Sequence, residues 1–281
     1  MTNVSVEFLN NPWIIAWKCA RGKWSIDSII PVLREFLEKN IDSKEYVCAL
    51  EFLKVFKQEA GEDKVLLLSQ KVFSEKLLEK IISDLNARNI VGVFKRDYNK
   101  AMGLLTLLEY LAKVVEASKI ADIIKEVFLM ILDDIDCKGY STYKDLVESI
   151  VSGPLTSLPT DYSVYILELL ANSENTEEIV KLKASILEII SATYPPKEYL
   201  RNKRLLEIIT KLMNNVIDYS TKLLDKEKEI ALRLYTGFNT AYSLIRHSCL
   251  ETGFIDVCKY IDEKISGSLN RLTSKVKRFE T

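Results

Sequence analysis

Apolar residues recur every three to four positions along almost the whole chain, and alternating apolar and polar runs long enough for a β-strand are absent. This spacing matches the turn of an α-helix, which places the apolar residues on one face of each segment. The sequence therefore predicts an all-α protein of about a dozen antiparallel amphipathic helices stacked around a continuous apolar core.

Capping residues and breakers divide this pattern into helices. The first predicted helix covers residues 6–18, and Ser43 is an N-cap candidate for a later helix that Gly61 ends. The pattern of residues 62–85 predicts another helix, which divides near Ser74.

The segment between Lys100 and Glu109 carries no charge, and apolar stripes cover two faces of the helix to which it belongs. A helix that is apolar on two faces is expected to lie between neighbouring helices. The next helical segment is nearly as apolar, so residues 95–132 are predicted to form the centre of the core.

A dozen helices in 281 residues means roughly one helix every two dozen residues. This rhythm resembles that of HEAT and armadillo solenoids, whose helix pairs repeat every 40 to 47 residues or so. The resemblance covers helix length and spacing only, since no residue motif of either family is present. An irregular helical bundle fits the same pattern equally well.

One segment has the composition of a domain boundary. Residues 152–159 combine a glycine, two prolines and small polar residues. The prediction is an N-terminal helical domain at 1–151 and a C-terminal helical domain at 160–281, and one continuous array is the alternative.

Charge is balanced, with 39 basic and 40 acidic residues and a net charge of −1. No long-range field therefore steers the molecule toward nucleic acid or anionic lipid, so such contacts would need a local patch. The first residues have no basic region and include Glu7 before any apolar run, which argues against a secretory signal. The longest charge-free stretches reach about 12 residues, short of the roughly 18 that a membrane span needs. We expect a cytoplasmic protein without a membrane partner.

Abundant Lys, Glu and Ile with few glutamines indicate a thermophilic, archaeal source, although the many asparagines weigh against it. His247 is the only histidine, and the five cysteines include no CxxC pair. Phosphate-binding glycine loops, the GxSxG elbow and HExxH are all absent from the sequence. The sequence therefore predicts no cofactor, identifies no catalytic residue, and favours a protein that is not an enzyme.

The stretch DIDCKGYSTYKD, residues 134–145, resembles an EF-hand calcium loop. Asp134, Asp136 and Asp145 match ligand positions, and Gly139 stands at the sharp turn. Lys138 occupies a position that needs an oxygen ligand, and no partner hand is visible. The favoured interpretation is an ordinary connection between helices, with no metal site and these three aspartates as a weak candidate.

Basic residues gather on one helix after a Tyr-Pro-Pro sequence. At 100° per residue they fall within an arc of about 80° beside the apolar face; they are Lys197, Arg201, Arg204 and Lys211. This row could hold a phosphate backbone or an acidic partner. A solvated helix face is the favoured interpretation, because Glu198 and Glu207 interrupt the positive charge.

Trp13, Trp17 and Trp24 lie close together near the N-terminus. Trp13 and Trp17 are four residues apart and share one helical face. The favoured interpretation is that they cap the end of the apolar core, and the alternative is that they anchor a partner.

Three functional hypotheses follow. The leading one is a non-catalytic interaction or scaffold subunit that presents a helical surface to a protein partner, because arrays of amphipathic helices build large surfaces. The second is a nucleic-acid-binding accessory subunit that uses the basic helix. The third is an enzyme of unrecognised class with a pocket between helices.

Overall fold

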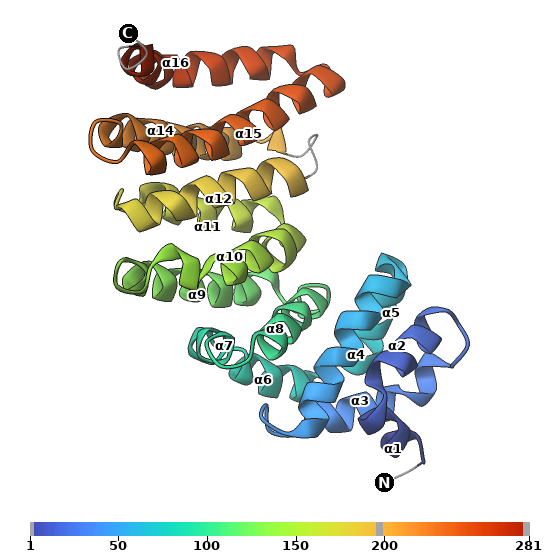
Figure 1. Ribbon diagram of the computed structural model, residues 1–281. Helices are drawn as coiled ribbons and strands as arrows, with labels where there is room; N and C mark the ends of the chain where they lie inside the picture. Colours follow the sequence, from blue (N-terminus) through green and yellow to red (C-terminus); the bar gives the residue numbers. More distant parts are fainter. Residues whose placement is uncertain (1–2, 195–198, 278–281) are drawn as a thin grey trace. The chain divides into compact units, whose positions relative to one another are not determined.

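The computed structural model describes residues 3–194 and 199–277 (Figure 1). Over these residues the secondary structure consists of fifteen α-helices with a few shorter helical turns, and it contains no strand. The prediction of an all-α protein is confirmed. The contacts divide the chain into an N-terminal unit, residues 1–130, and a C-terminal unit, residues 131–281. The division falls inside helix α9 (Ala117–Lys138).

Helix α4 is the centre of the N-terminal unit, where it packs against α2, α3, α5 and α8. Its apolar face carries Phe52 and Phe56, and the Phe52 ring stacks on Phe56 and on Phe8 of α1. The helices of this unit before α9 are α1 (Asn3–Asn10), α2 (Pro12–Ala20), α3 (Ile30–Leu37), α4 (Lys44–Ala60), α5 (Glu62–Val72), α6 (Glu75–Asp84), α7 (Ala87–Phe94) and α8 (Tyr98–Leu111).

Three of the predicted helix boundaries are confirmed, among them the end of α4 at Gly61, and one helix was predicted wrongly. The Ser43 hydroxyl accepts a hydrogen bond from the Tyr46 N–H at 3.1 Å, as an N-cap does. A break at Ser74 separates α5 from α6. The single helix expected at 6–18 is instead α1 and α2, because Pro12 has no N–H to continue the first helix and starts the second.

Helix α8 lies between neighbours, as its two apolar faces predicted. It packs against α4, α5 and α7, and ten of its fourteen residues are buried. Gly103 allows α8 to approach α4 closely, because a Cβ atom at this position would lie 2.8 Å from the Leu50 Cβ. The buried Tyr110 hydroxyl donates to the Leu53 carbonyl at 2.9 Å, which ties the same two helices together.

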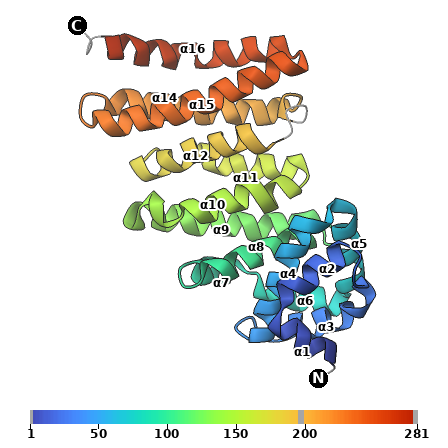
Figure 2. The same ribbon diagram turned by 45° about the vertical axis from the view of Figure 1, so that its right-hand side comes forward.

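The C-terminal unit is a stack of helices laid side by side, which both views show (Figures 1 and 2). Helix α12 packs against α14 and α15, and α14 also packs against α11 and α16. This stacking is typical of helix-pair arrays; the finer choice between solenoid and irregular bundle stays a prediction. The helices after α9 are α10 (Lys144–Ile150), α11 (Thr160–Asn172), α12 (Glu177–Thr193), α14 (Lys203–Leu223), α15 (Lys228–Thr252) and α16 (Ile255–Lys277).

The glycine- and proline-rich segment 152–159 belongs to the C-terminal unit. Residues Val151–Leu155 form a π-helical turn that continues α10, and Pro154 and Leu155 are buried in it. The Leu155 carbonyl accepts a hydrogen bond from the Ser163 hydroxyl at 2.8 Å. The compact units thus divide earlier in the chain than 152–159, and separate domains at 1–151 and 160–281 stay a prediction.

Among the helices formed by residues 3–194 and 199–277, none has both the length and the apolar character that crossing a bilayer requires.

Candidate functional site

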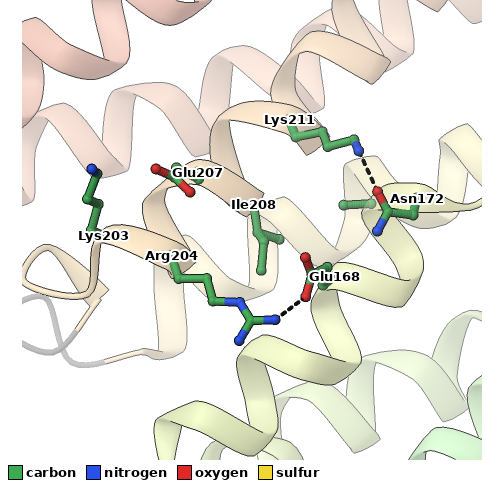
Figure 3. A pocket seen from close by; sticks show the side chains of 8 residues that line it. Glu168, Asn172, Lys203, Arg204, Glu207, Ile208 and Lys211 are labelled. Carbon is green, nitrogen blue, oxygen red and sulfur yellow. Dashed lines mark hydrogen bonds and ion pairs between the residues drawn. The ribbon is translucent and has the colours of Figure 1, made fainter.

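A cleft of about 540 Å³ opens between α11 and α14 in the C-terminal unit (Figure 3). Two of the basic residues singled out in the sequence, Arg204 and Lys211, line it. Arg201 does not, because it precedes α14 and its guanidinium lies 5.6 Å from the ring of Phe254. Lys197 lies outside the described residues.

The sequence of α14 explains why charged side chains line this cleft. The Asn202 side chain accepts a hydrogen bond from the Leu205 N–H at 3.0 Å and caps the helix start. Lys203, Glu207 and Lys211 follow at intervals of four residues, which places them in one row along the helix. The row lies beside the apolar stripe that packs α14 into the stack.

Helix α11 forms the other wall and supplies the partners of the two basic residues. The Arg204 guanidinium forms an ion pair with Glu168, and the Lys211 ammonium donates to the Asn172 side chain (Figure 3). Both members of the ion pair are partly exposed, so it contributes little to stability, at most about 1 kcal/mol. The ion pair holds the two side chains in place and reduces the positive charge of the cleft.

Side chains of α12 and α14 hold the C-terminal end of α11 in place by donating hydrogen bonds to its last carbonyls. Asn215 donates to the Ala171 carbonyl at 3.1 Å. The buried Lys183 donates to the Ser173 carbonyl at 2.8 Å and to the Asn175 side chain at 2.7 Å. Cations and amide donors are favoured there because the last carbonyls of a helix lack partners within it.

Burial lowers the pKa of the Lys183 ammonium to about 8, and the nearby charge of Lys211 adds to the effect. A lysine with such a pKa can act as a base or nucleophile in an active site. Lys183 is not placed as an active-site lysine would be, because its side chain is fully buried and two oxygens already accept hydrogen bonds from its ammonium. Its observed contacts are structural, and they order the turn between α11 and α12.

The lining of the cleft combines basic, acidic and apolar side chains. Lys203, Arg204 and Lys211 face two carboxylates, and Ala171 and Ile208 add apolar surface. The lining therefore carries both signs of charge, and it can form ion pairs and hydrogen bonds with a partner that also carries both. Over the described residues no group of three or more His, Cys, Asp or Glu side chains could hold a metal ion.

The residues of the EF-hand-like stretch are not arranged as a calcium loop. Asp134 and Asp136 lie in the last turns of α9, where Asp134 accepts from the Tyr143 hydroxyl and Asp136 from the Thr176 hydroxyl. Asp145 lies in the first turn of α10. In the described structure, Asp134 and Asp136 therefore bind hydroxyl groups of neighbouring segments.

The sequence did not reveal two features of the surface. Glu168 and Asn172 line the cleft but come from another helix, so only the packing of α11 against α14 brings them to the basic row. The expectation that the tryptophans cap the core is wrong for two of them, because Trp13 and Trp17 are 52% and 37% exposed.

Comparison of the chain with known protein families and with curated proteins found no match. The fold and the cleft define an all-α protein whose C-terminal unit is a stack of helices with an open cleft of mixed charge.

Proposed function

We propose that this protein is a non-catalytic interaction or scaffold subunit and that the cleft between α11 and α14 binds a protein partner. The observation that carries the proposal is the lining of the cleft, in which cations, carboxylates and apolar atoms alternate over an open surface. Protein interfaces combine these elements, with an apolar centre and a polar rim that forms hydrogen bonds. Complementary charges then determine which partner docks.

Nucleic-acid binding through the basic helix is the competing hypothesis, and the cleft favours it less. A phosphate backbone requires several cations that are not neutralised by the protein itself. Here Glu168 pairs with Arg204, and Glu207 stands between Lys203 and Lys211 in the row. The sequence-based hypothesis of an enzyme with a pocket between helices stays a prediction.

The test is affinity purification of the tagged full chain from the cells that make it, with and without charge reversal in the cleft. The variant is Arg204→Glu with Lys211→Glu. The matched control is Lys222→Glu with Lys226→Glu, which makes the same change in charge at exposed lysines near the far end of α14. We expect a partner to co-purify with the wild type and the control, and to be lost from the cleft variant.

Arg204→Gln with Lys211→Gln provides a second variant, since it removes both charges without placing a new carboxylate next to Glu168. Circular dichroism establishes that each variant is folded. The proposal is contradicted when the wild-type chain is recovered alone under gentle conditions. Recovery of RNA or DNA whose binding falls steeply with salt and depends on Arg204 would instead support the nucleic-acid hypothesis.

A further inference from the structure

The N-terminal unit carries a second surface with the composition of a binding site. Trp13 and Trp17 lie one turn apart on the outer face of α2, and they are 52% and 37% exposed. Tryptophan has a large apolar area, so leaving about half of Trp13 and over a third of Trp17 in contact with water is costly for a folded chain. Trp is also strongly enriched among the residues that dominate protein interfaces.

Cations lie over the rings of Trp17 and Trp24. The Lys23 ammonium lies 4.3 Å from the ring centre of Trp17, and the Arg21 guanidinium lies 5.7 Å from it. The Lys18 ammonium lies 5.2 Å from the ring centre of Trp24. Such contacts are attractive because the face of an aromatic ring is electron-rich. We call Trp13, Trp17, Lys18, Arg21, Lys23 and Trp24 the tryptophan surface.

The backbone at the end of α2 holds this surface in one arrangement. Gly22 has φ of 69°, its N–H donates to the Cys19 carbonyl, and the Lys23 N–H donates to the Lys18 carbonyl at 2.8 Å. This is the Schellman pattern, which ends a helix and turns the chain back along it. The turn therefore returns Lys23 to the ring of Trp17.

Contacts with α4 and α5 hold the same end of α2. Arg21 forms an ion pair with Glu59 at 2.9 Å, and the Lys64 ammonium donates to the Ala20 carbonyl at 2.5 Å. A surface that is ordered before binding loses less entropy when a partner docks.

The charge of the tryptophan surface indicates what it would bind. Lys18 and Arg21 have carboxylate neighbours, Glu7 at 3.5 Å and Glu59 at 2.9 Å. Within the part of the chain that the structure describes, Lys23 is seen only against the Trp17 ring and has no carboxylate partner. The surface is therefore apolar at its centre and positive at its edge, which complements an apolar anchor flanked by carboxylates.

We propose that the tryptophan surface is a docking site for an acidic peptide segment of a protein partner, with an apolar side chain against Trp13 and Trp17 and a carboxylate on Lys23. This site lies in a different unit from the cleft and does not depend on it. A chain with two such sites would join two partners, which is what a scaffold does.

Single-stranded nucleic acid is the other class of ligand that uses aromatic rings and cations. It binds by stacking bases on open ring faces along a positive groove. A positive groove needs several cations that the protein itself does not neutralise, whereas two of the three cations here are paired with carboxylates, Lys18 with Glu7 and Arg21 with Glu59. The observations thus favour a peptide, and nucleic acid is one outcome of the test.

The experiment selects peptides from a random library on the full chain and on the Trp17→Ala variant in parallel. We expect the wild type to enrich peptides in which Asp or Glu flank an aromatic or aliphatic residue, and the variant to lose them. Enrichment of basic or uncharged peptides, equal enrichment by the variant, or no enrichment would overturn the proposal.

Intrinsic fluorescence measures the affinity of a selected peptide directly. The three tryptophans of the chain all belong to this surface, so a blue shift on titration reports burial of the surface itself. We expect Trp17→Ala to weaken binding by about tenfold or more, and Lys23→Glu to weaken it severalfold. Lys76→Glu, an equal charge change at an exposed lysine of the same unit, should leave the affinity unchanged.

Two further titrations separate this proposal from others. The Arg204→Glu, Lys211→Glu variant should bind the peptide as the wild type does, so failure of the cleft and failure of this surface are distinguishable. A single-stranded oligonucleotide that displaces the peptide and binds in a Lys23-dependent manner would overturn the proposal in favour of a nucleic-acid site.

Discussion

Replacing Gly103 with alanine tests how closely α4 and α8 pack. The added Cβ would lie 2.8 Å from the Leu50 Cβ and 3.2 Å from its Cδ1. Leu50 is almost fully buried, and its Cβ is attached directly to the backbone of α4. A rotamer change cannot move that atom away, so the two helices would have to separate.

Two opposing effects set the magnitude. Alanine is favoured over glycine inside a helix by about 1 kcal/mol. Overpacking a well-packed core costs about 1–3 kcal/mol. Because the clash involves a Cβ that cannot rotate, we place the cost near the upper end and expect Gly103→Ala to lower the free energy of unfolding by about 1–2 kcal/mol.

Gly92→Ala is the matched control. Gly92 lies inside α7, in the same unit, and a Cβ there would meet nothing within 4 Å. Only the helix-propensity gain applies, so this variant should be more stable than the wild type by up to about 1 kcal/mol. The two substitutions are chemically identical, and we expect their effects to have opposite signs.

Urea unfolding followed by tryptophan fluorescence measures both variants. All three tryptophans lie between residues 13 and 24, in the same unit as both glycines, so the signal reports the unfolding of that unit. The midpoint should fall for Gly103→Ala and rise for Gly92→Ala, with similar denaturant slopes. A Gly103→Ala chain as stable as the wild type would refute the close packing of α4 and α8.

Three further predictions concern single side chains. Gly22→Ala should destabilise the N-terminal unit by about 1 kcal/mol, since φ of 69° is unfavourable for alanine, and urea unfolding measures the loss. Tyr110→Phe should cost about 1 kcal/mol in the same assay, because the hydrogen bond to the Leu53 carbonyl is lost. Lys183 has a pKa lowered to about 8, so between pH 8 and its ordinary value of 10.5 the unfolded chain binds more protons than the folded chain. The contribution of Lys183 to stability should therefore rise with pH across this window, by up to about 3 kcal/mol. The difference in free energy of unfolding between the wild type and Lys183→Met, measured by urea unfolding with circular dichroism, should shift in favour of the wild type by up to this amount from pH 8 to pH 10.5.

Local patterns were sufficient to predict the helices whose signals do not depend on distant residues. The uncharged stretch after Lys100 predicted a helix buried on two faces, and α8 lies between α4, α5 and α7. Ser43 marked a helix start because an N-cap side chain bonds to the nearest backbone N–H groups. Ser74 also precedes a helix, although its side chain forms no capping hydrogen bond. The prediction of one helix at 6–18 overlooked Pro12. Proline has no backbone N–H and therefore interrupts the hydrogen bonds of a helix, which is a purely local effect.

The spacing of residues alone could not decide two other features. The spacing of Asp134, Asp136 and Gly139 matches a calcium loop, yet the first two lie in α9 and only Gly139 turns the chain. Trp13 and Trp17 share a face, and that spacing cannot say whether the face is turned to the core or to solvent.

The candidate cleft was predicted only in part, for the same reason. Arg204 and Lys211 were found from their spacing on one helix, whereas Glu168 and Asn172 were missed because they lie on α11. Their presence changes the interpretation, since a row of cations becomes a surface of mixed charge. This change is what favours a protein partner over nucleic acid.

The most direct test of the central claim is the mass of the native particle that contains this chain, measured by size exclusion with light scattering in a gently prepared extract. We expect a mass well above the 32.2 kDa of the chain, with a different protein accounting for the difference. A particle of 32.2 kDa, or one built of this chain alone, would contradict it.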